Sequence, residues 1–313
     1  MNNSKLEKCP LVTIFTLVFN TGKYVVETLN SVRSNKYPNI QHIIIDDCSS
    51  DRESVPYIEK WIEDNNYPCT FIKHQRNMGI CKSINEVLQI TEGKYIFGVC
   101  DDLILPEKVQ RQVELLENAS PEYGVVYSDA YLINGNGTPR SGKFIRMHRK
   151  FADIPEGHIF DTLLEGNFIP AMATLVKTEC FKKVGMYDEK LGYEDFDMWL
   201  RIAKEYKFMF SDYISAKYRI NENGLHLTKK DWGMDDYRIY SKHIQHGPAV
   251  MKKLELAAAN IYKIHDHDNL NMVLGDFEKT FKRKPLLYYF VKLGIPYILY
   301  RIFFEILHIL KRK

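Results

Sequence analysis

The segment HIIIDDCSSD, residues 42–51, decides the fold because an unbroken apolar run passes directly into a polar loop. Three consecutive isoleucines without polar alternation predict a strand covered on both faces, as in a parallel sheet. The segments LVTIFTLVFN at residues 11–20 and KYIFGVCDD at residues 94–102 repeat this pattern. We therefore expect neighbouring parallel strands in all three segments, each followed at once by polar side chains.

Helical segments separate these strands. Apolar spacing predicts helices over residues 22–34, 55–65 and 80–90, with a short strand over residues 70–73. Since proline favours the first position of a helix, another helix is expected from near Pro106 to about Asn118. A strand over residues 124–133 then ends at an Asn-Gly-Asn-Gly turn. The alternation predicts an α/β fold with a mixed, mostly parallel sheet flanked by helices.

The composition is that of a folded protein without a nucleic-acid partner. Of 313 residues, 45% are hydrophobic and 27% are charged, and the formal net charge is only +3. Six cysteines occur without a CxxC pair, which predicts reduced thiols, and no apolar segment precedes the first strand. We expect a cytoplasmic protein with one large domain over residues 1–228 and a helical extension over residues 229–313.

Polar residues follow four strands at the edge where open α/β sheets bind their ligands. They are Phe19 and Asn20, Asp46 and Asp47, Lys73 to Asn77, and Asp101 and Asp102. The sequence therefore predicts one crevice that collects two acidic pairs, an aromatic side chain and a basic cluster.

Each of these groups suits a ligand, although each also has a structural alternative. Adjacent Asp101 and Asp102 suit Mg²⁺ or Mn²⁺ that also takes phosphate oxygens, or they cap the helix that follows. Asp47 offers a carboxylate to a base imide or a ribose hydroxyl. Phe19 suits either stacking on a base or packing in the core, and the sequence leaves both open.

A further acidic pair lies in the segment GYEDFDMWLR, residues 192–201. The apolar spacing after Phe196 predicts a helix, which places Glu194 and Asp195 at its N-terminus. The helix dipole there favours ionised carboxylates, and a general base must be ionised. An ordinary acidic helix cap is the alternative.

These signals occur in a fixed order, and together they resemble family 2 glycosyltransferases with the GT-A fold. The resemblance spans roughly residues 10 to 225 and rests on the motifs TIFTLVFN at 13–20, IDDCSSD at 45–51, NMG at 77–79, CDD at 100–102 with Pro106, and GYED at 192–195 with WLR at 199–201. It implies a nucleotide-sugar half over about residues 1–130 and an acceptor half over about residues 131–228.

The resemblance also implies roles for individual residues. Contacts to the nucleotide sugar, commonly a uridine diphosphate sugar, are implied for Thr16, Phe19, Asp47, Asn77, Lys82, Asp101 and Asp102. Asp102 would bind Mn²⁺ or Mg²⁺. Asp195 would take the proton from the acceptor hydroxyl, with Glu194 supporting it or contacting the acceptor. One displacement at the anomeric carbon would invert its configuration.

The sequence departs from the family pattern at three positions, Leu17, Ile84 and Val99. Ile84 stands where an arginine often contacts the diphosphate, so Lys82, Lys73 and Arg76 are candidates for that contact. His226 lies in a later segment that resembles a loop in which a histidine approaches the metal. A solvated loop histidine is the alternative.

Two other classes of protein compete with this interpretation. A sugar-nucleotide pyrophosphorylase would show a glycine-rich loop after its first strand, whereas this chain reads Phe19-Asn20-Thr21-Gly22. A non-catalytic scaffold of a membrane glycan assembly would need neither Asp102 nor Asp195.

The C-terminal segment is basic and amphipathic. Residues 282–313 carry eight lysines and arginines against a single acid, Glu305. From 285 to 310 the chain is mostly apolar, but Lys292 and Arg301 interrupt it before it is long enough to span a bilayer. We expect residues 285–313 to lie on the inner face of the cell membrane, near a glycan or lipid-linked acceptor of polysaccharide synthesis. Docking on the protein itself or on a second subunit is the alternative.

Overall fold

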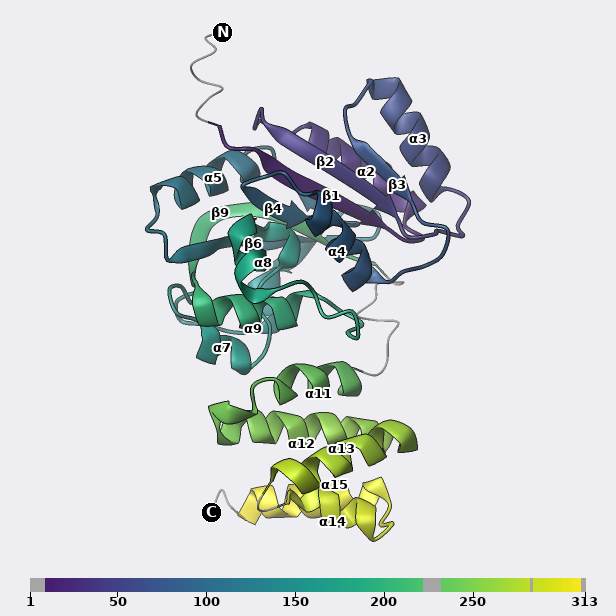
Figure 1. The fold of residues 1–313 in the computed structure, drawn as a ribbon, viewed down its shortest axis with the longest axis vertical. Helices are drawn as coiled ribbons and strands as arrows, with labels where there is room; N and C mark the ends of the chain where they lie inside the picture. The colour runs from purple at the N-terminus through teal and green to yellow at the C-terminus, as the bar shows by residue number, and fades with distance from the viewer. Residues whose placement is uncertain (1–8, 222–231, 282–283, 311–313) are drawn as a thin grey trace. The chain divides into compact units, whose positions relative to one another are not determined.

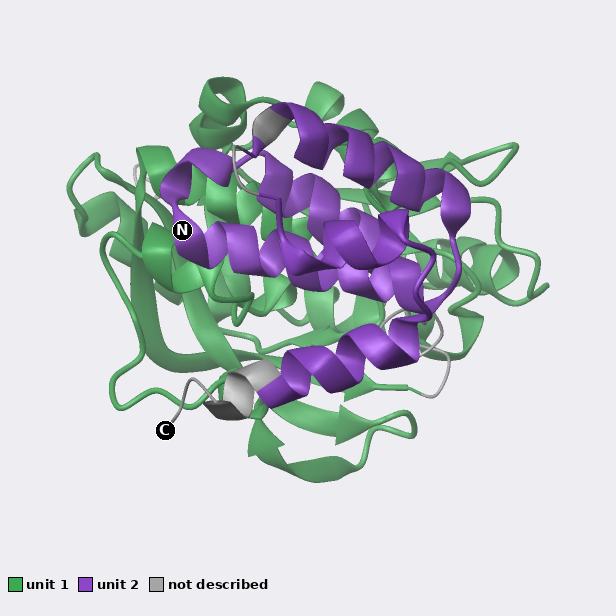
Figure 2. Ribbon diagram, turned by 90° about the horizontal axis from the view of Figure 1, so that it is seen from below, with its two compact units in different colours: residues 1–224 green, residues 225–313 purple. Residues whose placement is uncertain are grey.

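The computed structural model describes residues 9–221, 232–281 and 284–310. The chain divides into two compact units, Met1–Gly224 and Leu225–Lys313, which Figure 2 colours separately. The domain boundary expected at residue 228 falls in residues 222–231, outside the described part of the chain.

The first unit is built on a sheet of nine strands in its described part. The order is β3-β2-β1-β4-β8-β6-β9-β5, with β7 paired to β6. The bounds are β1 Val12–Val18, β2 Ile40–Asp46, β3 Thr70–Lys73, β4 Tyr95–Gly98, β5 Leu103–Ile104, β6 Tyr123–Asn134, β7 Pro139–Lys143, β8 Thr174–Lys177 and β9 Lys207–Ile220.

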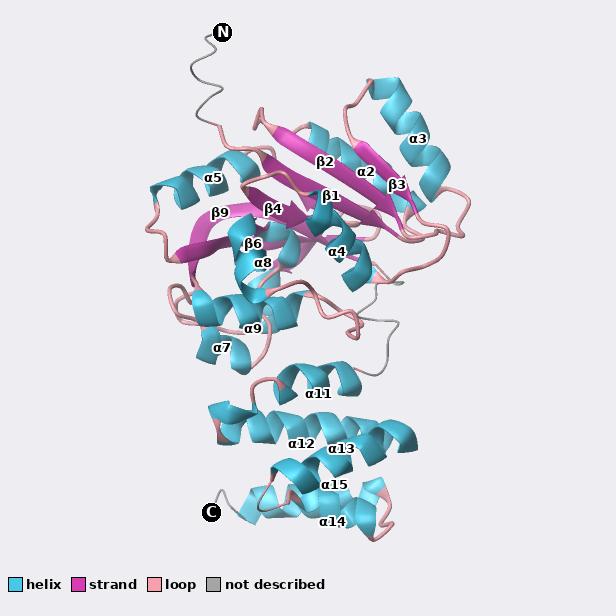
Figure 3. Ribbon diagram, in the orientation of Figure 1, coloured by secondary structure: helices cyan, strands magenta, loops and turns pink. Residues whose placement is uncertain are grey.

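Helices flank this sheet on both faces (Figures 1 and 3). They are α2 Gly22–Arg33, α3 Ser54–Asn65, α4 Ile80–Ile90, α5 Lys108–Asn118, α6 Phe144–His148, α7 Phe160–Leu164, α8 Thr178–Val184 and α9 Asp195–Glu205, with a short 3₁₀ turn at Ala171–Ala173. The expected α/β architecture is present, and the strand and helix predictions for residues 11–134 agree with it to within a few residues.

The sheet has a parallel half and a mixed half. Strands β3, β2, β1 and β4 are all parallel, which matches the apolar runs without alternation that predicted them. Strand β8 pairs antiparallel with β4 and β6, and β5 pairs antiparallel with β9. Strand β9 runs parallel to β6 along most of its length, and no sequence pattern predicted it.

Two apolar cores fix the helices to the sheet. On one face, Val18 and Ile44 pack with Leu29 of α2 and with Ile58 and Trp61 of α3. A second cluster packs α5 against β4, β6 and β8. Burying each such aliphatic side chain contributes about 1.5–3 kcal/mol.

A fully buried lysine also anchors α5. Lys108 Nζ donates to Gln112 Oε1 at 2.6 Å and to the Thr174 carbonyl at 2.7 Å, and it lies 3.6 Å from the centre of the Phe97 ring. Burial lowers the pKa of Lys108 well below its ordinary value. The lysine is therefore a polar link between α5 and β8.

The second unit is helical. It contains α11 Gly233–Ser241, α12 Pro248–Lys263, α13 His267–Thr280, α14 Leu286–Lys292 and α15 Tyr297–Leu310, with a 3₁₀ turn at Ile244–His246. Its core includes Leu254, Ala258, Phe277 and Leu287. None of the helices in the described part of the chain combines the length and hydropathy that crossing a bilayer requires.

Helix α15 leaves much of its apolar surface uncovered. Tyr300 is buried, but Ile298, Leu299, Ile302, Phe303 and Ile306 are each about half exposed. Arg301 on the same helix pairs with Glu305 at 3.0 Å. The charge of Arg301 is therefore partly neutralised, and the exposed apolar face is the larger feature of the helix.

Candidate active site

The register of the parallel half brings the predicted polar residues to one edge. Val18 lies beside Asp46, and Asp46 lies beside Lys73, so β1, β2 and β3 end at the same level. The segments that follow them therefore start side by side. Asn20 Oδ1 accepts hydrogen bonds from the amides of Ser50 and Asp51, which ties the first of these loops to the second.

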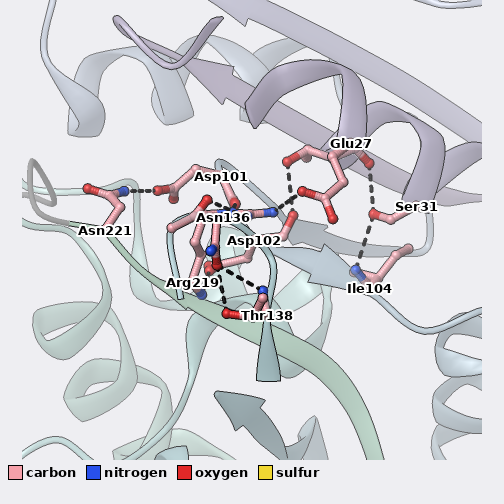
Figure 4. Close-up of polar contacts among 11 residues, drawn as sticks. Glu27, Ser31, Asp101, Asp102, Ile104, Asn136, Thr138, Arg219 and Asn221 are labelled. Atoms are coloured by element: carbon pink, nitrogen blue, oxygen red, sulfur yellow. Dashed lines mark hydrogen bonds and ion pairs between the residues drawn. The ribbon is translucent and has the colours of Figure 1, made fainter. Parts of the chain in front are cut away.

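Asp101 and Asp102 lie between β4 and β5, where β9 crosses them (Figure 4). Asp102 is 6% exposed, and its Oδ1 accepts a hydrogen bond from the Arg219 amide at 2.7 Å. The Asp101 carbonyl accepts from Arg219 Nε at 2.7 Å, and its carboxylate accepts from the Asn221 side-chain amide. These contacts fix both residues of the pair through the end of β9.

Arg219 is itself held from several sides. Its guanidinium is fully buried and donates to Glu27 Oε2 at 2.5 Å and to the Gly135 carbonyl at 3.1 Å. The guanidinium carbon also lies 4.8 Å from the centre of the Tyr24 ring. Figure 4 shows that Glu27, Arg219 and the acidic pair form one connected group. Arg219 stands at the start of the segment that resembles the family loop of His226, but the sequence predicted no role for Arg219 itself.

The acidic pair has the chemistry of a divalent-cation site. Burial and the charge of Asp101 raise the pKa of Asp102 well above its ordinary value, although Arg219 opposes this. Adjacent carboxylates, here the buried Asp102 and the partly exposed Asp101, are hard oxygen ligands of the kind that Mg²⁺ and Mn²⁺ take. The described residues contain no group of three or more His, Cys, Asp or Glu side chains placed to hold a metal, and His226 lies outside those residues. A cation here would need oxygens from water or a ligand.

The second acidic pair opens α9, as predicted. Asp195 is the first residue of the helix and Glu194 is its N-cap. Asp195 Oδ2 accepts a hydrogen bond from Asn167 Nδ2 at 2.9 Å. Since Asn167 Oδ1 accepts from the Ile169 amide, its NH₂ group is the end that faces Asp195. Asn167 is a second residue that the sequence analysis missed.

Burial affects the two carboxyl groups of this pair differently. Desolvation and the neighbouring charge of Asp195 raise the pKa of Glu194 to about 8. Desolvation also raises the pKa of Asp195, but hydrogen bonds from Asn167 and from the first amides of α9 oppose it. Because more donors stabilise the charge on Asp195, Asp195 is the member of the pair that ionises first.

Asp101, Asp102 and Asp195 all act electrostatically on Tyr218. Burial raises the pKa of the Tyr218 phenol, and the charges of Asp102, Asp101 and Asp195 all raise it further. The Tyr218 ring packs edge-on against Phe144 at 4.9 Å, and Phe144 stacks on His148 at 4.1 Å. Aromatic rings from β9 and α6 thus pack together beside the acidic residues.

Two polar side chains hold the loop that leads to Glu194. The Asn85 side chain bonds both the carbonyl and the amide of Tyr187. Arg201 donates to the carbonyls of residues 184–186 while pairing with Asp197 at 2.9 Å. Helices α4 and α9 are thereby linked, which joins the two halves of the unit around the site.

Three predicted nucleotide contacts lie exposed at the edge. The Phe19 side chain is 48% exposed, so packing in the core is excluded and its face remains available for stacking. Asn77 and Lys82 are exposed in the loop before α4 and in its first turn. Lys73 pairs with Glu59 at 2.7 Å, which leaves Lys82 and Arg76 as the better placed cations.

Two predicted contacts lie deeper than expected. Thr16 is fully buried and its hydroxyl lies 3.0 Å from His42 Nε2. The prediction that Thr16 contacts the nucleotide sugar is therefore wrong for its side chain, which points into the core under α2 and α3. Asp47 is 6% exposed and accepts hydrogen bonds from the amides of Met78 and Gly79. Through these two hydrogen bonds, Asp47 holds the loop that carries Asn77.

Sequence comparison gives a family. Residues 13–173 match the family described as Glycosyl transferase family 2. An uncharacterized glycosyltransferase of Methanocaldococcus jannaschii is 30% identical over 224 residues, covering 70% of this chain and 74% of that protein. The Bacillus subtilis glycosyltransferase TuaG, assigned to teichuronic acid biosynthesis, is 25% identical over 70% of this chain and 83% of its own length. Other relatives are longer, and the chain spans 65% of one from Rickettsia typhi and 30% of one from Rickettsia bellii.

Solved structures share the fold. S. aureus TarS in complex with UDP-GlcNAc has a TM-score of 0.59 and 16% identity, over 85% of this chain and 80% of that one. The mannosyltransferase PcManGT of Pyrobaculum calidifontis, in complex with GDP-Man and Mn²⁺, has a TM-score of 0.55 and 16% identity, over 91% and 79%. These similarities confirm the predicted GT-A fold class with a helical C-terminal region.

Proposed function

The chain belongs to glycosyltransferase family 2, and from this premise we propose that it transfers a sugar from a nucleotide diphosphate to an acceptor hydroxyl, with inversion. The observation that carries the proposal is that Asp101 and Asp102, held by the end of β9, and Asp195, held at the start of α9, all act electrostatically on Tyr218. UDP is the nucleotide we expect, on the resemblance of the strand-end motifs and on the UDP-GlcNAc in the TarS complex.

The donor would lie along the edge formed by the ends of β1, β2 and β3. Phe19 offers its exposed ring to the base, and Asn77 lies in the neighbouring loop. Arg76 and Lys82 are exposed cations in that loop and in the first turn of α4, and we propose them for the diphosphate. Asp47 acts by holding that loop, with its remaining acceptor capacity available to a base or ribose.

Mn²⁺ or Mg²⁺ is the proposed cofactor, with Asp102 as ligand and Asp101 beside it. Bound there, the cation would supply positive charge against the departing diphosphate. The residues fit this group because they present two neighbouring carboxylates that Arg219 and Asn221 keep in place. That a protein of the same fold was crystallised with GDP-Man and Mn²⁺ supports the proposal.

Asp195 is the proposed general base. Its carboxylate would take the proton of the acceptor hydroxyl as the hydroxyl oxygen attacks the anomeric carbon. The bond from that carbon to the diphosphate breaks, and its electron pair leaves with the diphosphate. Because a single displacement occurs at one face, the configuration inverts. Asn167 supports this role by keeping Asp195 oriented and easier to ionise.

The acceptor is proposed to be a glycan or lipid-linked glycan of polysaccharide synthesis, in line with the assignment of TuaG. We also propose that α15 lies on an anionic membrane surface, because its exposed apolar face adjoins a basic segment of the sequence. Replacing both Ile302 and Phe303 by glutamate should abolish sedimentation of the full chain with anionic vesicles. Leu256→Glu, at an exposed site on α12, should not. Equal binding of both variants would contradict the membrane proposal.

The transfer reaction is tested by measuring nucleotide release from a panel of nucleotide sugars, with Mn²⁺ and with excess EDTA. We expect turnover of a UDP-sugar that requires the cation. Asp102→Ala should lose both the cation requirement and most nucleotide affinity. Full activity in EDTA would contradict the proposed metal cofactor. If no nucleotide sugar releases its nucleotide, the non-catalytic scaffold is the better interpretation.

A further inference from the structure

A second group of charged side chains lies at the nucleotide edge, where β3 passes into α4. His74 Nδ1 is 2.7 Å from Asp47 Oδ1, and His74 Nε2 is 2.9 Å from Glu86 Oε2. The side chains of His74 and Asp47 are only 9% and 8% exposed, whereas that of Glu86 is 42% exposed. Nothing in the proposed reaction uses His74 or Glu86.

The geometry fixes the protonation of His74. Ionised carboxylates only accept hydrogen bonds, and a neutral imidazole carries a single N–H. Both ring nitrogens face carboxylate oxygens, so both contacts are satisfied only when the ring is an imidazolium. Burial lowers the pKa of His74, but the hydrogen bonds and charges of Asp47 and Glu86 outweigh it and raise the pKa above 6.5.

The same carboxylate holds the loop that follows. Asp47 Oδ1 also accepts from the Met78 amide at 2.7 Å, and Oδ2 accepts from the Gly79 amide at 2.9 Å. Gly79 has φ of +83°, a conformation that glycine adopts without strain. Residues 75–77, which include two of the proposed donor contacts, lie exposed between these anchors and His74. The position of Asp47 therefore decides the shape of the loop.

We propose that protonated His74 is a positioning residue for the nucleoside diphosphate, because it holds Asp47 and, through Asp47, the loop 74–79 at the donor edge. This rests on the proposed function for the identity of the ligand. Asp47 after β2 and Glu86 on α4 are the charged groups that contact the ring. The charged ring that satisfies both carboxylates is fully present at pH values below 6.5. As the pH rises through the raised pKa of His74, the ring loses its charge and keeps one N–H for two carboxylates.

Two measurements on the full chain test the inference. The rate of hydrogen exchange at the Met78 and Gly79 amides shows whether the loop is held. Calorimetric titration with UDP from about pH 6 to pH 9 measures the affinity for the nucleotide. At pH 6, His74→Gln should exchange these amides faster and bind UDP roughly tenfold more weakly, as expected for loss of a hydrogen bond to a charged group. It should also lose the wild-type decline in affinity at high pH.

Two further variants act as controls. Glu86→Gln keeps the contact between His74 and Asp47, so it should reduce the pH dependence with a smaller loss of affinity, because Glu86 is half exposed. Asp64→Asn removes an exposed ion pair of α3 and should change neither measurement.

The outcomes separate the inference from the proposed function. If His74→Gln keeps both amides protected and binds UDP as the wild type does at every pH, the inference is wrong. If the loop loosens in His74→Gln while the wild-type protein binds no UDP, the loop contact stands and the proposed donor fails. Should His74→Gln not fold, an unchanged pH profile in Glu86→Gln overturns the inference.

Discussion

The two acidic pairs of the candidate site are held in different ways. Asp101 and Asp102 are fixed by a backbone amide and a buried guanidinium of Arg219, which is anchored in turn to Glu27. Asp195 depends on the start of α9 and on a single side-chain amide from Asn167. The contacts from Arg219 fix the positions of Asp101 and Asp102, whereas the hydrogen bond from Asn167 also lowers the pKa of Asp195. This is the division expected between a ligand for a cation and a general base.

Removing the base is expected to give the largest effect on the reaction. Asp195→Asn keeps the shape of the side chain but cannot take a proton, so turnover should fall roughly 10² to 10⁴-fold. UDP affinity should stay near the wild-type value, because Asp195 lies outside the donor edge. Steady-state kinetics and calorimetry measure the two quantities. Near wild-type turnover would show that Asp195 is not the base.

Removing the anchor of the other pair should affect stability as well as donor binding. Arg219→Met deletes the buried hydrogen bonds to Asp101 and Gly135, and the free energy of unfolding should fall by about 3 kcal/mol. UDP affinity with Mn²⁺ should fall too. Glu27→Gln is the matched control, and because Glu27 is half exposed its cost should be less than about 1 kcal/mol. Equal losses in both variants would contradict the positioning role of Arg219.

Asn167→Ala should shift the pH profile of the reaction. Loss of its hydrogen bond raises the pKa of Asp195 further, so the acid limb of kcat/KM should move up by roughly one pH unit. Activity should recover at higher pH, which a purely structural defect would not allow. If Asn167→Ala lowers turnover but the acid limb of kcat/KM does not move, Asn167 does not act through the pKa of Asp195.

The smallest expected effect concerns Glu194 and stability. Its pKa is about 8 in the folded protein against 4.5 ordinarily, so between these values the folded chain binds more protons than the unfolded chain. The free energy of unfolding should therefore decrease as the pH rises from about 5 to 8. Glu194→Gln should flatten this slope in denaturant titrations. An unchanged slope would mean that Glu194 is ionised in the folded state.

The parallel half of the sheet and its strand-end residues could be predicted from the sequence. Strands buried on both faces need unbroken apolar runs, and the runs ending at Val18, Asp46 and Val99 have that form. Likewise the apolar spacing after Phe196 was enough to place Glu194 and Asp195 at the start of a helix. Local patterns of this kind do not depend on distant parts of the chain.

The partners of those residues were decided only by the tertiary structure. Strand β9 pairs with β6 and β5, which are distant in the sequence, and only that pairing brings Arg219 to Asp102. In the same way, Asn167 and His74 look like ordinary loop residues until the fold places a carboxylate against each of them. Thr16 is the reverse case, because a motif suggested a ligand contact and packing placed its side chain in the core. Sequence periodicity reports which face of an element is buried, whereas hydrogen-bond partners depend on pairings that only the complete fold defines.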